Sequence, residues 1–151
     1  MSKIVGMKPV PRPVREQSEM RSSVEQSQAL ALAAAKAGLE KKAMGVEIID
    51  VTGKVDYADF LVLMTGQSDR HVAAIADSVD HELAAQGNEA ISVEGLPAAE
   101  WVLIDFVDVV VHVFQRDYRS VYDLDGLWMD ARRVPVADEP ERGPTSGPVN
   151  A

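Results

Sequence analysis

The chain has 151 residues, of which 46% are hydrophobic, and it contains no cysteine. This length and composition indicate one globular domain with tails, and the missing cysteine excludes a disulfide framework and a thiolate metal site. We find no signal-peptide pattern and no apolar run of membrane-spanning length, so we expect a cytoplasmic protein. The formal net charge of −9 disfavours direct binding to nucleic-acid phosphates and favours a basic protein as partner.

Both ends of the chain differ in composition from its middle. Residues 1–25 contain alternating prolines and then a polar mixture, which cannot bury enough apolar surface to fold, so we predict a flexible N-terminal arm. Residues 134–151 are rich in proline and glycine, and we predict that this C-terminal tail is disordered. The folded domain is therefore expected over 26–133.

The first half of the domain shows helical and strand patterns in turn. An alanine-rich stretch without proline favours a helix, with Leu32 and Leu39 on its apolar face and Gly45 placed to end it. A continuous apolar run, FLVLM, favours a strand buried on both faces, and Ser68 is a suitable N-cap for the helix after it. The predicted elements are a helix over 26–43, strands over 46–51 and 60–64, a helix over 69–86 and a strand over 90–93. The last strand, helix and strand predict a parallel crossover, expected to be right-handed.

The longest apolar run, EWVLIDFVDVVVHVF from Glu100 to Phe114, organises the second half of the domain. It is too long for one strand and too polar for a membrane span, so we predict two strands joined by a tight turn near 105–108. A short helix is predicted over 123–131. Together these elements predict an α/β fold, a single compact domain with a mixed, mostly five-stranded sheet that is covered by helices.

Two short patterns carry candidate chemistry. The Gly66-Gln67-Ser68 turn could hold an anion at a helix N-terminus, but an ordinary turn with a capping serine is the favoured interpretation. Asp105 and Asp108 could hold Mg²⁺ for phosphoryl or nucleotidyl transfer, yet their spacing suits turn-forming aspartates better. The three histidines lack metal-ligand spacing, and the sequence contains no serine-hydrolase elbow.

The two tryptophans, Trp101 and Trp128, are candidates for either core packing or interface anchoring. Tryptophan is rarely buried completely, and it is enriched among the residues that dominate binding energy. For Trp101, which starts a predicted strand after a loop, both interpretations stay open on the residues alone.

Several ordered blocks of the sequence resemble the ribosomal silencing factors, also called the Iojap-like family. The blocks are DFLVLMTGQSDRHVAAIAD (59–77), EG (94–95), AEWVLIDFVDVVVHVF (99–114) and YDLDGLW (122–128). The resemblance implies a nucleotidyltransferase-like α/β domain without catalytic residues, enzymatic activity or a cofactor. It also implies binding to the large ribosomal subunit through a basic protein of the intersubunit face. Bound there, such a factor blocks joining of the small subunit and represses translation, and homodimers are common in the family.

The resemblance also singles out residues for partner binding. Trp101 falls in the family's A-[ED]-W block, which belongs to the ribosome-facing surface, and this favours the interface interpretation. The other residues implied for the partner-binding surface are Val102, Asp105, Asp108, His112, Tyr122 and Leu124. The alternative function is a divergent Mg²⁺-dependent nucleotidyltransferase.

Val107 departs from the family pattern, which usually has glycine between Phe106 and Asp108. Glycine would suit a tight turn with positive φ, a conformation that a β-branched residue resists. We therefore expect either a wider turn or strands that pair through a different loop.

Overall fold

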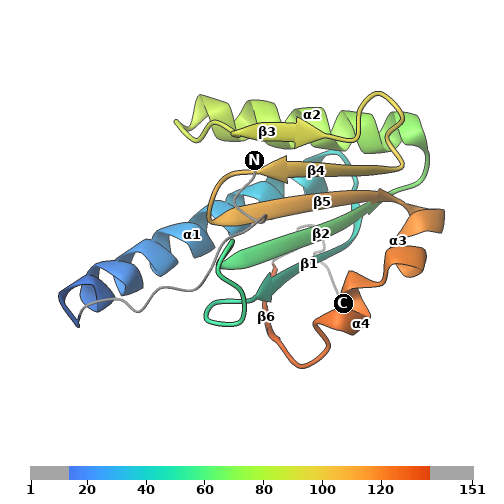
Figure 1. Cartoon of the computed structure of the whole chain (residues 1–151). Helices are drawn as coiled ribbons and strands as arrows, with labels where there is room; N and C mark the ends of the chain where they lie inside the picture. The colour runs from blue at the N-terminus through green and yellow to red at the C-terminus, as the bar shows by residue number, and fades with distance from the viewer. Residues whose placement is uncertain (1–13, 137–151) are drawn as a thin grey trace, which may run out of the picture.

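The computed structural model describes residues 14–136, with side chains from residue 23 onward. Figure 1 shows a sheet with the two long helices, α1 (Val14–Glu40) and α2 (Asp69–Ala85), packed on one side of it. The strands are β1 (Met44–Asp50), β2 (Phe60–Gly66), β3 (Ser92–Glu94), β4 (Trp101–Asp105), β5 (Val109–Gln115) and β6 (Arg132–Val134). Two short helices, α3 (Arg116–Tyr122) and α4 (Leu124–Leu127), follow β5.

The sheet is mixed, and its six strands lie in the order β3-β4-β5-β2-β1-β6. β2 and β5 pair in parallel at the centre, whereas the other neighbouring pairs are antiparallel. The predicted α/β fold is confirmed, with one strand more than expected. The extra strand is β6, which at three residues is too short to show a strand period in the sequence. Since β3 runs parallel to β2, the predicted parallel crossover through α2 is also confirmed.

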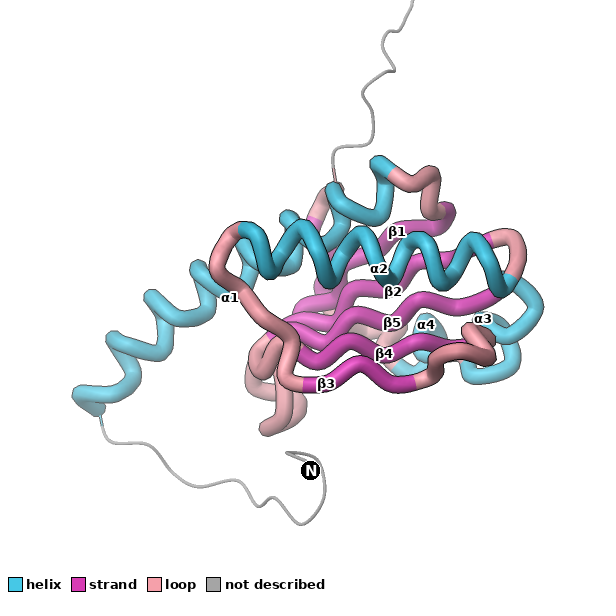
Figure 2. Tube along the Cα trace, turned by 90° about the horizontal axis from the view of Figure 1, so that it is seen from above, coloured by secondary structure: helices cyan, strands magenta, loops and turns pink. Residues whose placement is uncertain are grey.

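Helix α1 is longer than predicted, because it begins at Val14, directly after Pro13, and not near residue 26. No proline interrupts the stretch that follows, and a proline is well tolerated next to a helix start. The part of the predicted flexible arm that covers 14–25 is therefore helical, and its first turns extend beyond the sheet (Figures 1 and 2). Residues 1–13 of that arm, and the predicted tail from 137 onward, lie outside the described residues.

Alanines, and not the predicted leucines, form the buried face of α1. Ala31 and Ala34 have no exposed surface, whereas Leu32 is 37% exposed. Small side chains let α1 pack closely on the sheet and on α2. Figure 2 shows from above that both helices lie on the same side of the sheet. The helix ends at Glu40, so Gly45 lies within β1 and does not end the helix as predicted.

The junction of β2 and α2 follows the sequence prediction. Gly66 permits the turn, since a Cβ there would lie 2.9 Å from the backbone nitrogen of Val72. Ser68 is the N-cap of α2, and its hydroxyl accepts a hydrogen bond from the backbone N–H of His71 at 3.1 Å. All residues of β2 are buried, as expected for a central strand with both faces covered.

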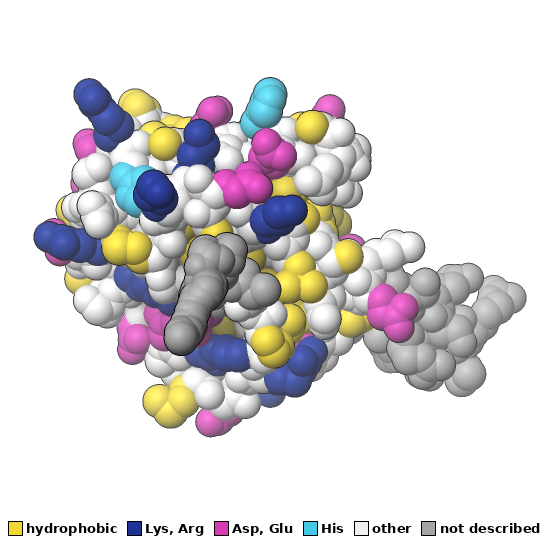
Figure 3. Space-filling view, turned by 180° about the vertical axis from the view of Figure 1, so that it is seen from behind, with side chains coloured by type: hydrophobic (Ala, Val, Ile, Leu, Met, Phe, Trp, Pro, Cys, Tyr) yellow, Lys and Arg dark blue, Asp and Glu magenta, His cyan; other side chains and the backbone are white. Residues whose placement is uncertain are grey.

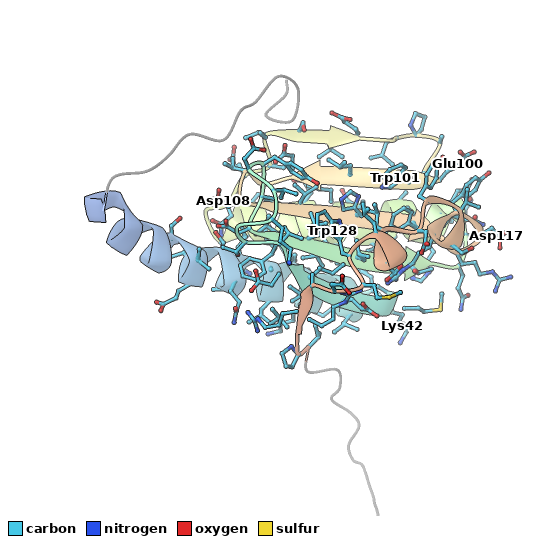
Figure 4. The ribbon with its side chains drawn as sticks, turned by 60° about the horizontal axis from the view of Figure 1, so that its bottom comes forward. Lys42, Glu100, Trp101, Asp108, Asp117 and Trp128 are labelled. Carbon is cyan, nitrogen blue, oxygen red and sulfur yellow. The ribbon has the colours of Figure 1, made fainter. Side chains whose placement is uncertain are left out.

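The face of the sheet opposite α1 and α2 has a second, smaller core that is only partly covered. Leu61, Leu63 and Phe114 are buried there. Tyr57, from the β1–β2 connection, and Trp128, just after α4, pack against them while keeping part of their surface in solvent. This face is turned toward the reader in Figure 4.

The chain after β5 folds differently from the prediction. Residues 116–122 form α3, where no helix was predicted, and the helix predicted over 123–131 is reduced to α4. The chain turns away after α4 because β6 pairs with β1, and ion pairs from Arg132 to Asp50 and from Arg133 to Glu47 accompany this pairing. No helix of the described residues is long and apolar enough to cross a membrane.

The predicted hairpin of β4 and β5 is confirmed, but its turn is tight, so the expectation of a wider turn or a different loop is wrong. Val107 itself takes a positive φ of 81°. The Asp108 N–H donates to the Phe106 carbonyl at 3.1 Å, which places Val107 at the centre of a strained γ-turn. Asp105 Oδ1 accepts the Val107 N–H at 2.8 Å, and the Phe106 N–H donates to the Val109 carbonyl at 2.9 Å. These hydrogen bonds offset the strain.

Candidate functional site

An aromatic cluster lies on the partly covered face of the sheet, at the end of β4 and β5 nearest α3. We define it by Trp101, His112, Phe114 and Tyr122. Ring centroids are 5.3 Å apart for Trp101 and Phe114, 5.8 Å for Trp101 and His112, and 4.3 Å for Trp101 and Tyr122. The cluster forms because Trp101 pairs with Phe114 across neighbouring strands, and His112 lies two residues before Phe114 on the same face.

The connection between β3 and β4 delivers Trp101 to this position. Gly95 has a φ of 104°, and a Cβ on it would collide with the carbonyl oxygen of Trp101. The backbone therefore needs glycine at this approach. The Gln115 N–H donates to the Glu100 carbonyl at 2.9 Å, which extends the β4–β5 pairing up to the residue before Trp101.

His112 is the buried polar member of the aromatic cluster and is only 6% exposed. Its Nδ1 accepts a hydrogen bond from the Trp101 indole N–H at 3.0 Å. Burial disfavours the charged imidazolium and lowers the pKa of His112 from 6.5 to about 4. The ring is therefore neutral at physiological pH, with Nδ1 as acceptor and its proton on Nε2.

Tyr122, at the end of α3, covers the outer side of the aromatic cluster and is 46% exposed. Residues of α3, of α4 and of the segment just after α4 add apolar surface, because Val121, Leu127 and Met129 are 69%, 67% and 72% exposed. Leu124 is half-buried and packs against the second core. Trp101 and Tyr122 thus leave part of the cluster exposed, and the segment 121–129 adds further exposed apolar side chains, a feature that is common at protein interaction sites.

Arg119 holds α3 and α4 against the sheet. Its Nε and Nη2 donate to the two carboxylate oxygens of Asp125 at 3.0 and 2.8 Å. Its Nη1 donates to the Gly45 carbonyl at 2.6 Å and to the Thr65 hydroxyl at 2.9 Å. The hydrogen bonds from Arg119 lower the pKa of Asp125, although its partial burial acts in the opposite direction. Arg119 thus ties α3, which ends at Tyr122, to α4 and to the sheet.

Two acidic residues lie near the aromatic cluster, and one of them, Asp117, pairs with the exposed Arg116 at 3.9 Å. Glu100 precedes Trp101, and Asp117 lies in the first turn of α3 (Figure 4). The negative charge of Glu100 raises the pKa of Tyr118, which lies next to it. The back of the molecule, seen in Figure 3, carries basic and acidic side chains interspersed. Glu100 thus adds negative charge next to the aromatic cluster, and a negative charge there suits a basic partner.

The structure separates the other predicted partner-binding residues from the aromatic cluster. Val102 is fully buried on the opposite face of β4, in the core beneath α2, so it supports the sheet and does not reach the surface. Asp105 and Asp108 lie at the far end of the hairpin. Asp105 caps the turn, as the turn-forming interpretation predicts, and the Asp108 carbonyl accepts the Asp59 N–H at 2.7 Å.

The remaining candidate chemistry has structural explanations. Ser68 caps α2, which agrees with the interpretation of Gly66-Gln67-Ser68 as an ordinary turn, and the Gln67 N–H donates to His71 Nδ1 at 2.9 Å. Among the side chains described, those of residues 23–136, histidine, aspartate and glutamate form no group of three that could hold a metal ion. The Arg119–Asp125 pair was not predicted from the sequence. The two residues are six positions apart, and within a single helix only residues three or four positions apart lie next to each other.

The chain was compared with known protein families, and residues 24–149 match the family model described as "Ribosomal silencing factor during starvation". Among curated proteins, it is 41% identical over 105 residues to the ribosomal silencing factor RsfS of Bacillus subtilis, covering 70% of this chain and 86% of the relative. It is 27% identical over 92 residues to the mouse protein named mitochondrial assembly of ribosomal large subunit protein 1, covering 59% of this chain and 40% of the relative.

A crystal structure of a protein from Chromobacterium violaceum has the same fold, with a TM-score of 0.67 and 31% sequence identity. The match covers 75% of this chain and 93% of the other. The structural similarity thus extends over nearly the whole length of that protein, and this agrees with the single α/β domain described above.

Proposed function

The chain belongs to the ribosomal silencing factor family, and on that premise we propose that it binds the large ribosomal subunit and represses translation by keeping the small subunit from joining. The names of its bacterial relatives support a silencing role on the ribosome and a regulatory rather than an enzymatic activity. The name of the mouse relative supports the large subunit as the place of binding. The site of action is the cytoplasm.

One observation about the surface carries this proposal, namely the partly exposed Trp101 within an aromatic cluster that has Glu100 and Asp117 near it. Tryptophan and tyrosine are enriched among residues that dominate binding energy. Proteins that bind ribosomal RNA tend to be basic, because they must neutralise phosphate. A basic protein on the intersubunit face of the large subunit therefore fits both the apolar centre and the acidic surroundings of this face.

The mechanism is steric. Attraction between the acidic face and a basic partner speeds the encounter, and burial of Trp101 and Tyr122 slows dissociation. A bound domain of this size then occupies space that the small subunit needs. The chemistry requires no catalytic group, since occupancy alone suffices to lower the number of joined ribosomes.

The test is co-sedimentation of the purified protein with separated ribosomal subunits at near-physiological salt. The proposal expects co-migration with the large subunit alone and fewer joined particles when the small subunit is added. Co-migration with neither subunit would refute it. The sedimentation of the free protein also tests the homodimer that the family resemblance implies.

The role of Trp101 is tested with Trp101→Ala in the same assay. Removal of a central tryptophan anchor typically costs about 2 kcal/mol or more, so the affinity should fall by about 30-fold or more. Leu32→Ala is the matched control, because Leu32 is an exposed apolar residue on α1, away from the aromatic face. Equal loss in both variants, or a folded Trp101→Ala variant with unchanged affinity, would contradict the role of Trp101.

A further inference from the structure

His112 is a buried polar side chain in an otherwise apolar part of the sheet, and contact with a partner does not explain it, because its side chain lies beneath the surface. We propose that His112 is a positioning residue: its Nδ1 accepts the Trp101 indole N–H and holds the indole in the orientation that a partner meets. This inference rests on the proposed function for its consequence in binding. The hydrogen bond itself can be tested without any partner.

The geometry gives the indole of Trp101 few alternatives. Tyr122 packs on it at a centroid distance of 4.3 Å, and Phe114 stacks on it with an interplanar angle of 24°. His112 is in turn stacked with Phe114 at 9°. Ring packing alone would still allow the indole to slide or tilt within the cluster. The hydrogen bond to His112 is directional, and it therefore selects one orientation.

Partner binding increases the free-energy contribution of the hydrogen bond between Trp101 and His112. In the free protein, water can reach the exposed part of the Trp101 indole, but a bound partner would exclude that water. A buried N–H without an acceptor costs free energy, and His112 removes this cost by supplying the acceptor from within the domain. The partner can then pack an apolar group or an aliphatic side-chain stem on the carbon atoms of the indole, and it needs no acceptor of its own. Preorganisation of this kind also lowers the entropy lost on binding.

Two substitutions with the same side-chain shape separate the acceptor from the packing. Leucine and asparagine both branch at Cγ and have equal numbers of side-chain heavy atoms, but only asparagine carries an oxygen near the position of Nδ1. In His112→Leu we expect binding to the large subunit about three- to tenfold weaker, the usual effect of losing one hydrogen bond. In His112→Asn we expect most of that loss to be restored. Equal affinities for His112→Leu and wild type would overturn the inference.

Nuclear magnetic resonance tests the hydrogen bond in the wild-type protein. An N–H···N hydrogen bond transmits a scalar coupling between its two nitrogens, so ¹⁵N-labelled protein should show a coupling from Trp101 Nε1 to His112 Nδ1. The two indole signals of the chain are distinguished with Trp101→Phe. The Trp101 indole N–H should also exchange slowly with solvent in wild type and His112→Asn, and quickly in His112→Leu. Absence of the coupling together with fast exchange in wild type would overturn the inference even if the His112 variants do not fold.

The two assays distinguish failure of this inference from failure of the proposed function. A coupling in a protein that does not bind the large subunit would refute the proposed function and, with it, the role of His112 in binding. Wild-type binding with no coupling would leave the proposed function intact and refute His112 as the positioning residue. The role of His112 in binding is supported only if the protein shows the coupling and also binds the large subunit.

Discussion

The stability of the domain should depend on pH through His112 over a defined range. Burial holds its pKa at about 4 in the folded protein, against 6.5 for an unperturbed histidine. The unfolded chain therefore binds a proton more readily than the folded chain between these two values. The contribution of neutral His112 to the free energy of unfolding is fully present above about pH 6.5. It decreases as the pH falls toward 4 and changes no further below that.

The magnitude follows from the difference between the two pKa values of His112. Each pKa unit corresponds to about 1.4 kcal/mol, so a shift from 6.5 to about 4 amounts to roughly 3 kcal/mol over the whole range. At about pH 4.5 most of this loss, roughly 2.5 kcal/mol, is already reached. Because the whole domain is expected to be stable by only about 5–15 kcal/mol, this is a measurable fraction of its stability. Protonated Nδ1 cannot accept the Trp101 N–H, so the same change breaks that hydrogen bond.

The assay is urea unfolding of wild type and His112→Asn at about pH 7 and about pH 4.5. Asparagine does not titrate, and the carboxylates of the domain contribute equally to both proteins. At about pH 7 wild type should be the more stable protein, and its advantage should shrink by roughly 2.5 kcal/mol at about pH 4.5. An unchanged stability difference between the two proteins at the two pH values would refute the reasoning that His112 is neutral because it is buried.

Two further substitutions test the hairpin turn and the support of α3. Val107→Gly should be about 1 kcal/mol more stable than Val107→Ala in urea unfolding, because glycine relieves the positive φ of 81° whereas alanine keeps it. A less stable glycine variant, the usual order at unstrained positions, would contradict the γ-turn. Arg119→Lys should destabilise the domain by about 1–2 kcal/mol and weaken subunit binding, because lysine cannot form the bidentate hydrogen bond that Arg119 makes with Asp125. An unchanged stability would show that α3 is held in place by packing alone, and Asp125→Asn is the matched control on the other side of the pair.

Some elements follow from local sequence patterns, and these predictions are confirmed. The apolar run from Glu100 to Phe114 can only be accommodated as a hairpin, and Ser68 begins α2 as its side chain predicts. The resemblance to the family implies that Trp101 lies on a binding surface, and this stays a prediction, although the structure shows Trp101 only partly buried. The relation to the nucleotidyltransferase fold stays a prediction.

Other elements depend on contacts that the local pattern does not contain. β6 is a strand only because β1 lies beside it, and α1 buries alanines and exposes Leu32 because the adjacent sheet and α2 leave little space. The family pattern with glycine at the turn led to the wrong expectation for Val107, since neighbouring hydrogen bonds hold the strained residue.

For the candidate site, the sequence by itself determined which side chains are available and, by strand alternation, that Trp101 and Val102 face opposite sides of β4. Only the tertiary structure decided that His112 lies beneath Trp101 as its acceptor, and that α3 brings Tyr122 over both. The physical reason is the distance along the chain over which each interaction acts. Side-chain alternation is a property of one strand, whereas register between strands and the covering of a sheet face are settled by packing between residues far apart in the chain.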